Sequence, residues 1–287
     1  MGGSASAGAG SAGGAGDAGG GGGAVPVVCE LAHAAGVEAL TVMSGGMERK
    51  VRLFVPSGYD GHGRLPLVLN LHGSTDNADN FANLTEMEQV AEANGFAVSG
   101  LEAVAGMWNV PPEAGKPDDV AYASDTIEAV SKLLCIDQAR VYATGFSGGG
   151  RMSSRLGCLL PDKIAAIGPV AGVRWPPPCP GRPVPVLAIH GLADGTNAYV
   201  GEGPEHPRWD ESVEDAVTGW AQKNGCSPTR IVDDPAGALS TYSYAECQAD
   251  ASVELIRMDG IDHIYPTGEP LHAAERVWAF FERYSLP

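Results

Sequence analysis

One serine lies in a sequence pattern that predicts a nucleophile. Ser147 is at the centre of the motif GFSGG (145–149), between an apolar run at Arg140–Thr144 and a helical pattern that follows it. A serine on such a sharp strand-to-helix turn adopts strained backbone angles and holds its hydroxyl clear of the sheet. Gly-x-Ser-x-Gly also occurs by chance in glycine-rich chains, but the flanking elements favour a nucleophile over a structural turn. The predicted chemistry is attack on a carbonyl carbon.

A serine hydroxyl is a weak nucleophile unless a base removes its proton. At a turn of this kind the partners follow in the order acid, then histidine, on loops after later strands. The strand expected at Val184–His190 leads to Asp194, and the strand expected at Val253–Met258 leads to His263. We therefore expect His263 to be the general base and Asp194 to orient it, with Asp262 as a competing candidate for the acid.

Two backbone amides are expected to form an oxyanion hole. One is the N–H of Gly148, next after the nucleophile, and the other comes from the loop after Leu67–Leu71, where Ser74 and then Thr75 are the candidates. The other histidines are interpreted as surface residues (His33, His62, His206 and His272) or as structural hydrogen-bonding groups at strand ends (His72 and His190).

The elements that must position these residues alternate between short apolar runs and longer amphipathic stretches. Strands are expected at Leu40–Val42, Lys50–Val55, Leu67–Leu71, Phe96–Gly100, Arg140–Thr144, Ala165–Val170, Val184–His190 and Val253–Met258. Helices are expected at Phe81–Asn94, Asp118–Leu134, Ser147–Leu159, Ser212–Asn224 and Leu271–Tyr284. This alternation predicts an α/β fold with a mostly parallel central sheet and helices on both faces.

Long loops beyond the strand ends of such a sheet are where substrate sites form. The irregular stretches rich in Pro, Gly and Trp are Met107–Pro117, Val173–Pro183 and Gly195–Asp210. Trp108, Trp175 and Trp209 lie in these loops, and their indoles could stack on an aromatic acyl group or a sugar ring. The alternative for each is loop packing.

The cysteines number six, and none forms a CxxC pair or sits with histidines at zinc-binding spacing. The expected disulfides are Cys226 with Cys247, Cys135 with Cys158, and Cys29 with Cys179. The Cys226–Cys247 bond would close the loop between a helix and the next strand. The Cys135–Cys158 bond would join two chain segments at one end of the sheet, and Cys29–Cys179 follows by elimination. Buried free thiols remain the alternative for the second and third pairs.

Composition divides the chain into a linker and one catalytic domain. Residues 1–24 are almost entirely Gly, Ala and Ser and should form a flexible linker, whereas 25–287 suit a single α/β domain. No stretch reaches the roughly 18 to 20 apolar residues of a membrane helix, and a signal segment is absent. We expect an exported protein, secreted or tethered to the cell surface, in which a lipid anchor on the linker stays an open alternative.

The net charge of −17 argues against nucleic acid as a partner, because its phosphates would be repelled. The acidity is read as a means of keeping an exported protein in solution, and it could also disfavour strongly anionic polymers. The predicted chemistry needs no metal and no cofactor. An ester, small or borne on a polymer, is the expected partner, and the chain is expected to act as a monomer.

The chain resembles the secreted feruloyl esterases and polyhydroxybutyrate depolymerase-like esterases of the α/β-hydrolase superfamily. The matching segments are LPLVLNLHG (65–73), DDVAYASDTIEAVSKLLCIDQARVYATGFSGGG (118–150), IAAIGPVAG (164–172), VPVLAIHGLAD (184–194), NGC (224–226) and DGIDH (259–263). The resemblance implies hydrolysis of aryl or short-chain esters on plant cell-wall polymers, or of polyesters. The sequence departs from it after His263, and in a shorter, less aromatic loop at 107–117, so substrate preference is less determined than the chemistry.

The sequence therefore predicts a serine carboxylic ester hydrolase, with feruloyl esters of cell-wall polysaccharide as the first substrate. A polyester depolymerase is the alternative, followed by an acetyl-xylan esterase and then a peptidase. A hydrolase-fold protein without activity, displayed to bind glycans or partners, is the alternative from another class.

Overall fold

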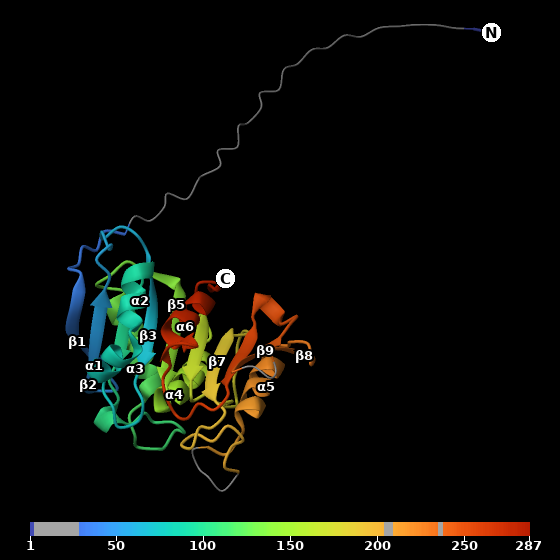
Figure 1. The fold of residues 1–287 in the computed structure, drawn as a ribbon. Helices are drawn as coiled ribbons and strands as arrows, with labels where there is room; N and C mark the ends of the chain where they lie inside the picture. The colour runs from blue at the N-terminus through green and yellow to red at the C-terminus, as the bar shows by residue number, and fades with distance from the viewer. Residues whose placement is uncertain (3–28, 204–208, 235–237) are drawn as a thin grey trace.

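The computed structural model describes residues 1–2, 29–203, 209–234 and 238–287. These residues form a ten-stranded sheet in the order β1-β2-β4-β3-β5-β6-β7-β10-β9-β8 (Figure 1). Its strands are β1 Gly36–Ser44, β2 Met47–Val55, β3 Leu65–Leu71, β4 Ala97–Leu101, β5 Ile136–Phe146, β6 Ala166–Val170, β7 Val186–Gly191, β8 Arg230–Asp233, β9 Leu239–Tyr244 and β10 Val253–Met258. The predicted linker at 1–24 falls almost wholly outside the described residues.

The middle of the sheet is parallel, as the alternating sequence pattern predicts. β4, β3, β5, β6, β7 and β10 run in the same direction, whereas β1 and β2 at one edge and β9 and β8 at the other pair antiparallel. β3, β4, β6 and β7 are buried throughout, which explains their continuous apolar sequences. The loops that follow the parallel strands therefore meet at one edge of the sheet.

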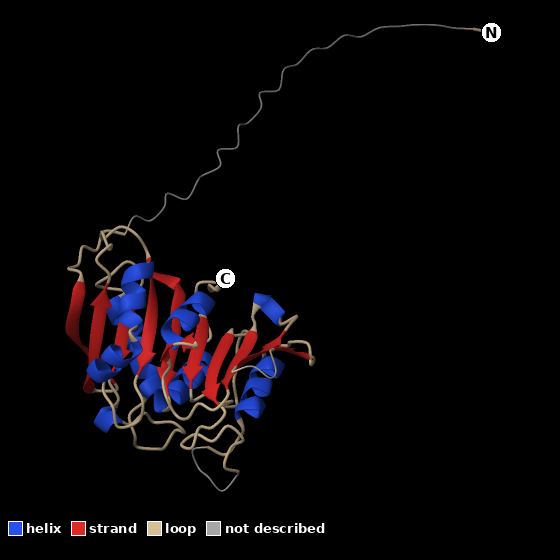
Figure 2. Ribbon diagram, viewed as in Figure 1, coloured by secondary structure: helices blue, strands red, loops and turns tan. Residues whose placement is uncertain are grey.

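Helices cover both faces of this sheet (Figure 2). They are α1 Ala78–Thr85, α2 Met87–Asn94, α3 Asp119–Val130, α4 Gly148–Leu159, α5 Val213–Lys223 and α6 Ala273–Phe281, with short 3₁₀ turns at Val104–Gly106 and Gln248–Asp250. A small ribbon, β11 Thr267–Gly268 with β12 Leu271–His272, precedes α6. One apolar core lies under α3, α4 and α5 and a second under α1, α2 and α6. No helix of the described chain is both long and apolar enough to cross a bilayer.

Two features differ from the sequence prediction. The helix expected at Phe81–Asn94 is broken into α1 and α2 by Glu86, which adopts a left-handed conformation (φ 56°). The strands β9 and β8 were not expected, although β9 alternates half-buried and buried residues along LSTYSY. Both strands extend the sheet beyond β10 and so lengthen the edge on which the loops gather.

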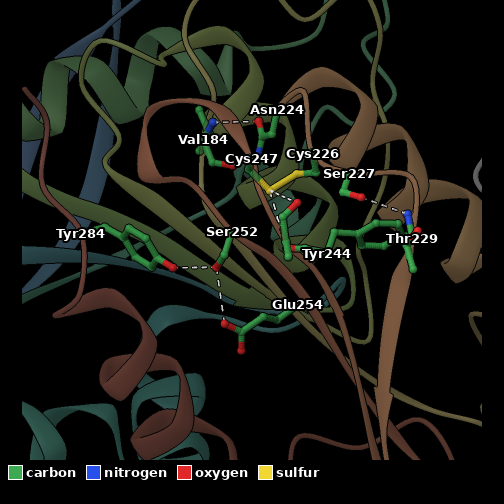
Figure 3. The surroundings of a disulfide bond; sticks show 11 residues. Val184, Asn224, Cys226, Ser227, Thr229, Tyr244, Cys247, Ser252, Glu254 and Tyr284 are labelled. Atoms are coloured by element: carbon green, nitrogen blue, oxygen red, sulfur yellow. Dashed lines mark hydrogen bonds between the residues drawn. A yellow bond between two sulfur atoms is a disulfide. The ribbon is translucent and has the colours of Figure 1, made fainter.

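The structure has three disulfides in its described residues, and two of the predicted pairings are wrong. Cys226 is bonded to Cys247, as predicted, between the end of α5 and the turn after β9 (Figure 3). The other bonds join Cys29 to Cys135 and Cys158 to Cys179, so the expected pairs Cys135–Cys158 and Cys29–Cys179 do not form. Three disulfides indicate an oxidising, extracytoplasmic environment.

The reason for the different pairing lies in two segments that return to this end of the sheet. The N-terminal segment passes beside the start of β5, where Leu31 N donates to Gly61 O and Tyr59 Oη donates to Leu31 O. The proline-rich segment after β6 instead folds back along α4 and brings Cys179 against Cys158. Cys135 is therefore bonded to the N-terminal segment, and Cys158 to the proline-rich segment after β6.

Candidate functional site

Ser147 stands on a sharp turn between β5 and α4. Its backbone has φ 53° and ψ −113°, a strained conformation that turns the residue out of both elements. The turn is held because its neighbours lack side chains: a Cβ at Gly149 would lie 1.9 Å from the carbonyl oxygen of Leu71, and one at Gly145 would lie 2.5 Å from the same oxygen. The Gly-x-Ser-x-Gly motif is thus required by close packing of α4 on β3.

His263 and Asp194 are brought together at the same edge of the sheet. The Nδ1 of His263 is 2.7 Å from Oδ2 of Asp194, whose carboxylate is fully buried, while the imidazole is 15% exposed. Asp194 follows β7 and His263 follows β10, and these two strands are parallel neighbours. An imidazole held in this way has Nε2 available for proton transfer.

The carboxylate of Asp194 is stabilised in its ionised form. Burial alone would raise the pKa of Asp194, but hydrogen bonds from His190, His263 and the amides of Asn197 and Thr196 outweigh burial and hold this pKa well below its usual value. The amides donate to Oδ1 over 2.7 Å from Asn197 and 2.9 Å from Thr196. The acid therefore stays charged throughout the neutral range.

Asp262, the competing candidate for the acid, forms hydrogen bonds with backbone amides. Its Oδ1 accepts hydrogen bonds from the amides of Gly195 (2.9 Å) and His263 (2.7 Å), and these bonds lower the pKa of Asp262. The side chain thereby ties the loop after β7 to the loop after β10. Asp262 contacts the main chain of His263, whereas Asp194 contacts its imidazole.

The nucleophile and the histidine are neighbours without a direct bond. The ring of His263 lies against Phe146, the residue before Ser147, with 4.7 Å between ring centroids. Among the described residues no hydrogen bond joins Ser147 Oγ to His263 Nε2, and Ser147 is 7% exposed. In free enzymes such hydrogen bonds are often long and tighten when substrate binds.

His190 is a second histidine on Asp194, a role that the sequence did not predict beyond a structural hydrogen bond. Its Nε2 lies 3.2 Å from Asp194 Oδ2 and 2.8 Å from Asn197 O, and the ring is fully buried. Because both contacts are acceptors, Nε2 must carry the proton. The signal for this contact is the spacing of His190 and Asp194 in HGLAD, four residues apart across a tight turn.

The two expected oxyanion donors lie side by side. Gly148 is the first residue of α4, so its N–H has no partner within the helix. Position 148 is close to Ser74, since a Cβ there would be 3.2 Å from Ser74 N and 2.5 Å from Ser74 Oγ. Of the two candidate residues, Thr75 donates its amide to Gly106 O (2.8 Å), whereas the described residues provide no partner for the amide of Ser74. This favours Ser74 over Thr75.

His72 and Trp108 support the loop that carries Ser74. The Nε2 of His72 accepts from Ala103 N (3.0 Å), so its Nδ1 carries the proton and donates to Gly73 O (2.7 Å). The indole of Trp108 donates to His72 O over 2.8 Å, and its ring packs against the imidazole. The segments after β3 and β4 are therefore fixed to each other.

A cavity of about 260 Å³ opens beside the oxyanion donors. It is lined by Ser74, Val104, Ala105, Met107, Trp108, Asn109, Val110, Pro111, Glu113, Lys116, Pro117, Gly148 and Arg151. The loop predicted at Met107–Pro117 thus forms one wall, as its position after a parallel strand suggests. Trp108 belongs to this wall but is only 6% exposed, so little of its ring is open to a substrate.

The other two tryptophans differ from each other in their surroundings. Trp209 is 1% exposed, stacks on His190 and donates to Ala198 O, so it packs beneath the acid and presents no face to a substrate. Trp175 packs edge-on against Trp220 and lines a neighbouring cavity. The expectation of stacking therefore fails for Trp209, because its side chain is buried; loop packing, the alternative, describes its position.

No group of three His, Cys, Asp or Glu side chains in the described part of the chain is arranged to hold a metal ion. The chemistry of the site rests on the groups named above: a strained serine, an imidazole oriented by a buried carboxylate, and two adjacent amides. This set matches the requirements for acyl transfer through a covalent intermediate.

Comparisons with known proteins show the family and the fold. Residues 50–177 match the family model described as esterase PHB depolymerase. Feruloyl esterase C of Emericella nidulans is 31% identical, covering 81% of this chain and 83% of that protein. Feruloyl esterase B of Piromyces equi is 29% identical over 83% of this chain, which spans 46% of that longer protein.

Solved structures show the same fold at low sequence identity. An acetyl xylan esterase from Aspergillus awamori superposes with a TM-score of 0.64 at 15% identity, covering 86% of this chain and 98% of that one. An S-formylglutathione hydrolase from Agrobacterium tumefaciens reaches 0.59 at 14% identity, covering 86% of this chain and 94% of that one. The chain belongs to the feruloyl esterase and polyhydroxybutyrate depolymerase-like family and is a serine carboxylic ester hydrolase of the α/β-hydrolase fold.

Proposed function

We propose that this enzyme hydrolyses hydroxycinnamoyl esters, with Ser147 as nucleophile, His263 as general base and Asp194 as the residue that orients the base. The observation that carries the assignment is the 2.7 Å contact between His263 Nδ1 and the buried Asp194 carboxylate, beside a serine with φ 53°. The amides of Gly148 and Ser74 complete the site as the oxyanion hole.

In the first half of the reaction, Ser147 Oγ attacks the ester carbonyl while its proton passes to His263 Nε2. The carbonyl oxygen gains the negative charge, which the amides of Gly148 and Ser74 stabilise. The tetrahedral intermediate collapses, the C–O bond to the alcohol breaks, and His263 returns the proton to the leaving oxygen. Asp194 stays ionised and stabilises the imidazolium.

In the second half, water replaces the alcohol. His263 takes a proton from the water, whose oxygen attacks the acyl carbon of the covalent intermediate. The bond to Ser147 Oγ breaks, the serine regains its proton from His263, and the free acid leaves. Both halves use the same oxyanion hole, so no further group has to move.

The substrate class is supported by the relatives and by the shape of the site. Two relatives that match most of this chain are named feruloyl esterases. The cavity beside Gly148 has an apolar wall of Met107, Trp108 and Val110, which suits an aryl group. A polyester depolymerase is the second candidate because of the family-model match. Acetyl xylan is less favoured: the relative named a bifunctional acetylxylan esterase/xylanase, from Neocallimastix patriciarum, is 24% identical over 84% of this chain, below the identity of the feruloyl esterases, and the solved acetyl xylan esterase shares the fold alone.

The test compares initial rates on methyl ferulate, p-nitrophenyl acetate and a solid polyester film. We expect methyl ferulate to be the best substrate. Ser147→Ala should abolish turnover of all three, while Ser153→Ala, which removes another serine hydroxyl from α4, should stay active. Hydrolysis of the film with little turnover of ferulate would replace this substrate class with polyesters, and turnover by Ser147→Ala near the wild-type rate would refute the nucleophile.

We further propose that the enzyme acts outside the cytoplasm as a monomer, and that residues 1–24 tether it. Its three disulfides support an extracytoplasmic location. Membrane association of the natural protein that resists a high-salt wash and is released by detergent would establish the tether, and recovery in the culture medium would count against it. A fluorophosphonate probe that labels wild type but not Ser147→Ala would exclude a purely glycan-binding role.

A further inference from the structure

A second cavity adjoins the one at the oxyanion hole. It has a volume of about 460 Å³ and shares Val110, Pro111 and Arg151 with the first cavity, so the two adjoin at these residues. Its remaining wall is largely apolar, made by Leu159, Trp175 and the run Pro176–Pro178. Nothing in the catalytic cycle described above uses this space.

One face of α4 forms the floor of both cavities. Gly148, Arg151, Arg155 and Leu159 recur at intervals of three or four residues and so lie in line on the helix surface. At 1.5 Å per residue, Arg155 lies about 10 Å along the axis from the oxyanion donor Gly148. A substrate whose carbonyl is at Gly148 would therefore bring a group one or two rings away to Arg155.

The charge in this second cavity is opposite to that of the molecule. The chain carries a net charge of −17, yet three arginines line the cavity. Arg174 is ion-paired with Asp210 and Glu211, although its buried Nη1 has no hydrogen-bond partner among the described residues. Arg155 forms no hydrogen bond or ion pair with any described residue. It also borders a smaller hollow containing Glu113 and Asp118, without pairing with either.

We propose that the second cavity is a subsite for a carboxylate borne on a ring, one or two rings from the ester that Ser147 cleaves. Arg155 would bind the carboxylate, and Trp175 with Pro176–Pro178 would pack against the ring. An acidic sugar and a carboxylated aromatic group share this chemistry. The inference rests on the proposed function, since it names the substrate class of the same site.

The binding test uses the full chain carrying Ser147→Ala, with biphenyl-4-carboxylate and its uncharged match biphenyl-4-carboxamide, by isothermal titration calorimetry. Because the overall charge repels anions, binding of the carboxylate at least about tenfold tighter than the amide would require a local cation. Adding Arg155→Gln should remove the preference and Arg155→Lys should keep most of it. Arg140→Gln, the same charge change near the start of β5, should leave it intact.

Turnover distinguishes the two sources of carboxylate. One pair of substrates is the acetyl ester of a disaccharide ending in glucuronic acid or in glucose, and the other is 4′-carboxybiphenyl-4-yl or 4′-carbamoylbiphenyl-4-yl acetate. We expect kcat/KM to favour the charged member of at least one pair, and Arg155→Gln to abolish that preference without changing the rate on the neutral member more than about twofold.

Equal binding of the two biphenyl compounds, or equal loss of both in Arg155→Gln, would overturn the subsite, and neither result depends on catalysis. Cleavage of neutral esters with no preference in either pair would overturn it too, while leaving the proposed function in place. Absence of any Ser147-dependent cleavage would instead refute the proposed function, and the calorimetry would still decide on the subsite.

Discussion

Asp194 receives hydrogen bonds from two imidazoles, and only one of them can take part in proton transfer. His263 is 15% exposed and lies against Phe146, the residue before the proposed nucleophile, whereas His190 is buried and donates Nε2–H to Asp194 and Asn197. His190 thus fixes the carboxylate in the orientation that His263 needs. In the terms of the reaction it is a positioning residue.

Replacing His190 should therefore lower the rate without weakening substrate binding. We expect His190→Phe to reduce kcat by about ten- to a hundredfold, the loss of one hydrogen bond to a charged group, with KM close to wild type. His190→Gln, which keeps an N–H donor, should recover part of kcat. A rise in KM with unchanged kcat would show that His190 does not act through Asp194.

The lowered pKa of Asp194 predicts how stability depends on pH. Because the folded state holds the carboxylate ionised, the unfolded state takes up the proton first as pH falls, and the contribution of Asp194 is complete above about pH 4 to 5 and declines below that. The free energy of unfolding of wild type should exceed that of Asp194→Asn at pH 7, and the difference should narrow at pH 3. A difference that stays constant between these two pH values would contradict this prediction.

The same substitution should lower kcat at neutral pH by about 10⁴-fold, because an amide cannot hold the required tautomer of His263. Asp262→Asn is the matched control, since an amide oxygen can still accept from the amides of Gly195 and His263. We expect it to retain activity within about tenfold. A larger loss there than in Asp194→Asn would make Asp262 the acid.

At the scale of residues, the sequence motifs predict where the catalytic side chains lie but not how the loops around them fold. The positions of Ser147, Asp194 and His263 after strand ends could be predicted from the sequence, because motif and strand pattern coincide; their catalytic roles stay a prediction. The bond of Thr75 N to Gly106 O and the burial of Trp209 could not, since each depends on how a long loop folds. Those details decide the oxyanion donor and the stacking surface.

At the scale of elements, a buried ion pair positions the wall of the first cavity. Arg49 on β2 donates to Asp119 at the start of α3 over 2.7 Å, and both side chains are almost wholly buried. The other oxygen of Asp119 accepts from Asn109 N, also over 2.7 Å. Arg49 further donates to Glu102 O, so β2, α3 and the loop after β4 are fixed by one pair of side chains.

Breaking this pair should affect both stability and the site. Asp119→Asn leaves a buried guanidinium without its counter-charge, and we expect a loss of about 3–5 kcal/mol in the free energy of unfolding together with a higher KM for methyl ferulate. Asp118→Asn, one residue earlier, should be nearly neutral because asparagine caps a helix as well as aspartate does. Denaturant titrations of both variants measure the difference, and equal effects would contradict the assignment.

The helices and strands could be predicted where their buried residues form a continuous run or a regular helical pattern. Fully buried runs such as β3, and the amphipathic α4 and α5, were located from sequence within a few residues. β8 and β9 were missed because β8, at the edge of the sheet, is mostly exposed and β9, beside it, alternates half-buried and buried residues, so neither has a continuous apolar sequence. The break at Glu86 was missed because its left-handed conformation depends on packing of α2, with no glycine to indicate it.

For the whole molecule, two disulfides of equal loop length make a matched comparison. Cys158–Cys179 and Cys226–Cys247 each span a separation of 21 residues, so either loss should cost about 3 kcal/mol of stability. Only the first anchors Pro176–Pro178 on α4. We expect the double serine variant of the first pair to lose kcat/KM on ring-extended esters, and that of the second pair to keep it. Equal kcat/KM of the two variants on those esters would show that the position of Pro176–Pro178 does not affect catalysis.

The order of the central strands along the chain also determines at what stage of folding the catalytic residues can come together. Ser147 follows β5 and Asp194 follows β7, but His263 follows β10, the last strand of the sheet along the chain, which lies between β7 and β9. A chain being synthesised carries its nucleophile more than a hundred residues before its base. With these roles, we expect hydrolytic activity only once β10 has joined the sheet, so a chain whose sheet is incomplete should not cleave esters.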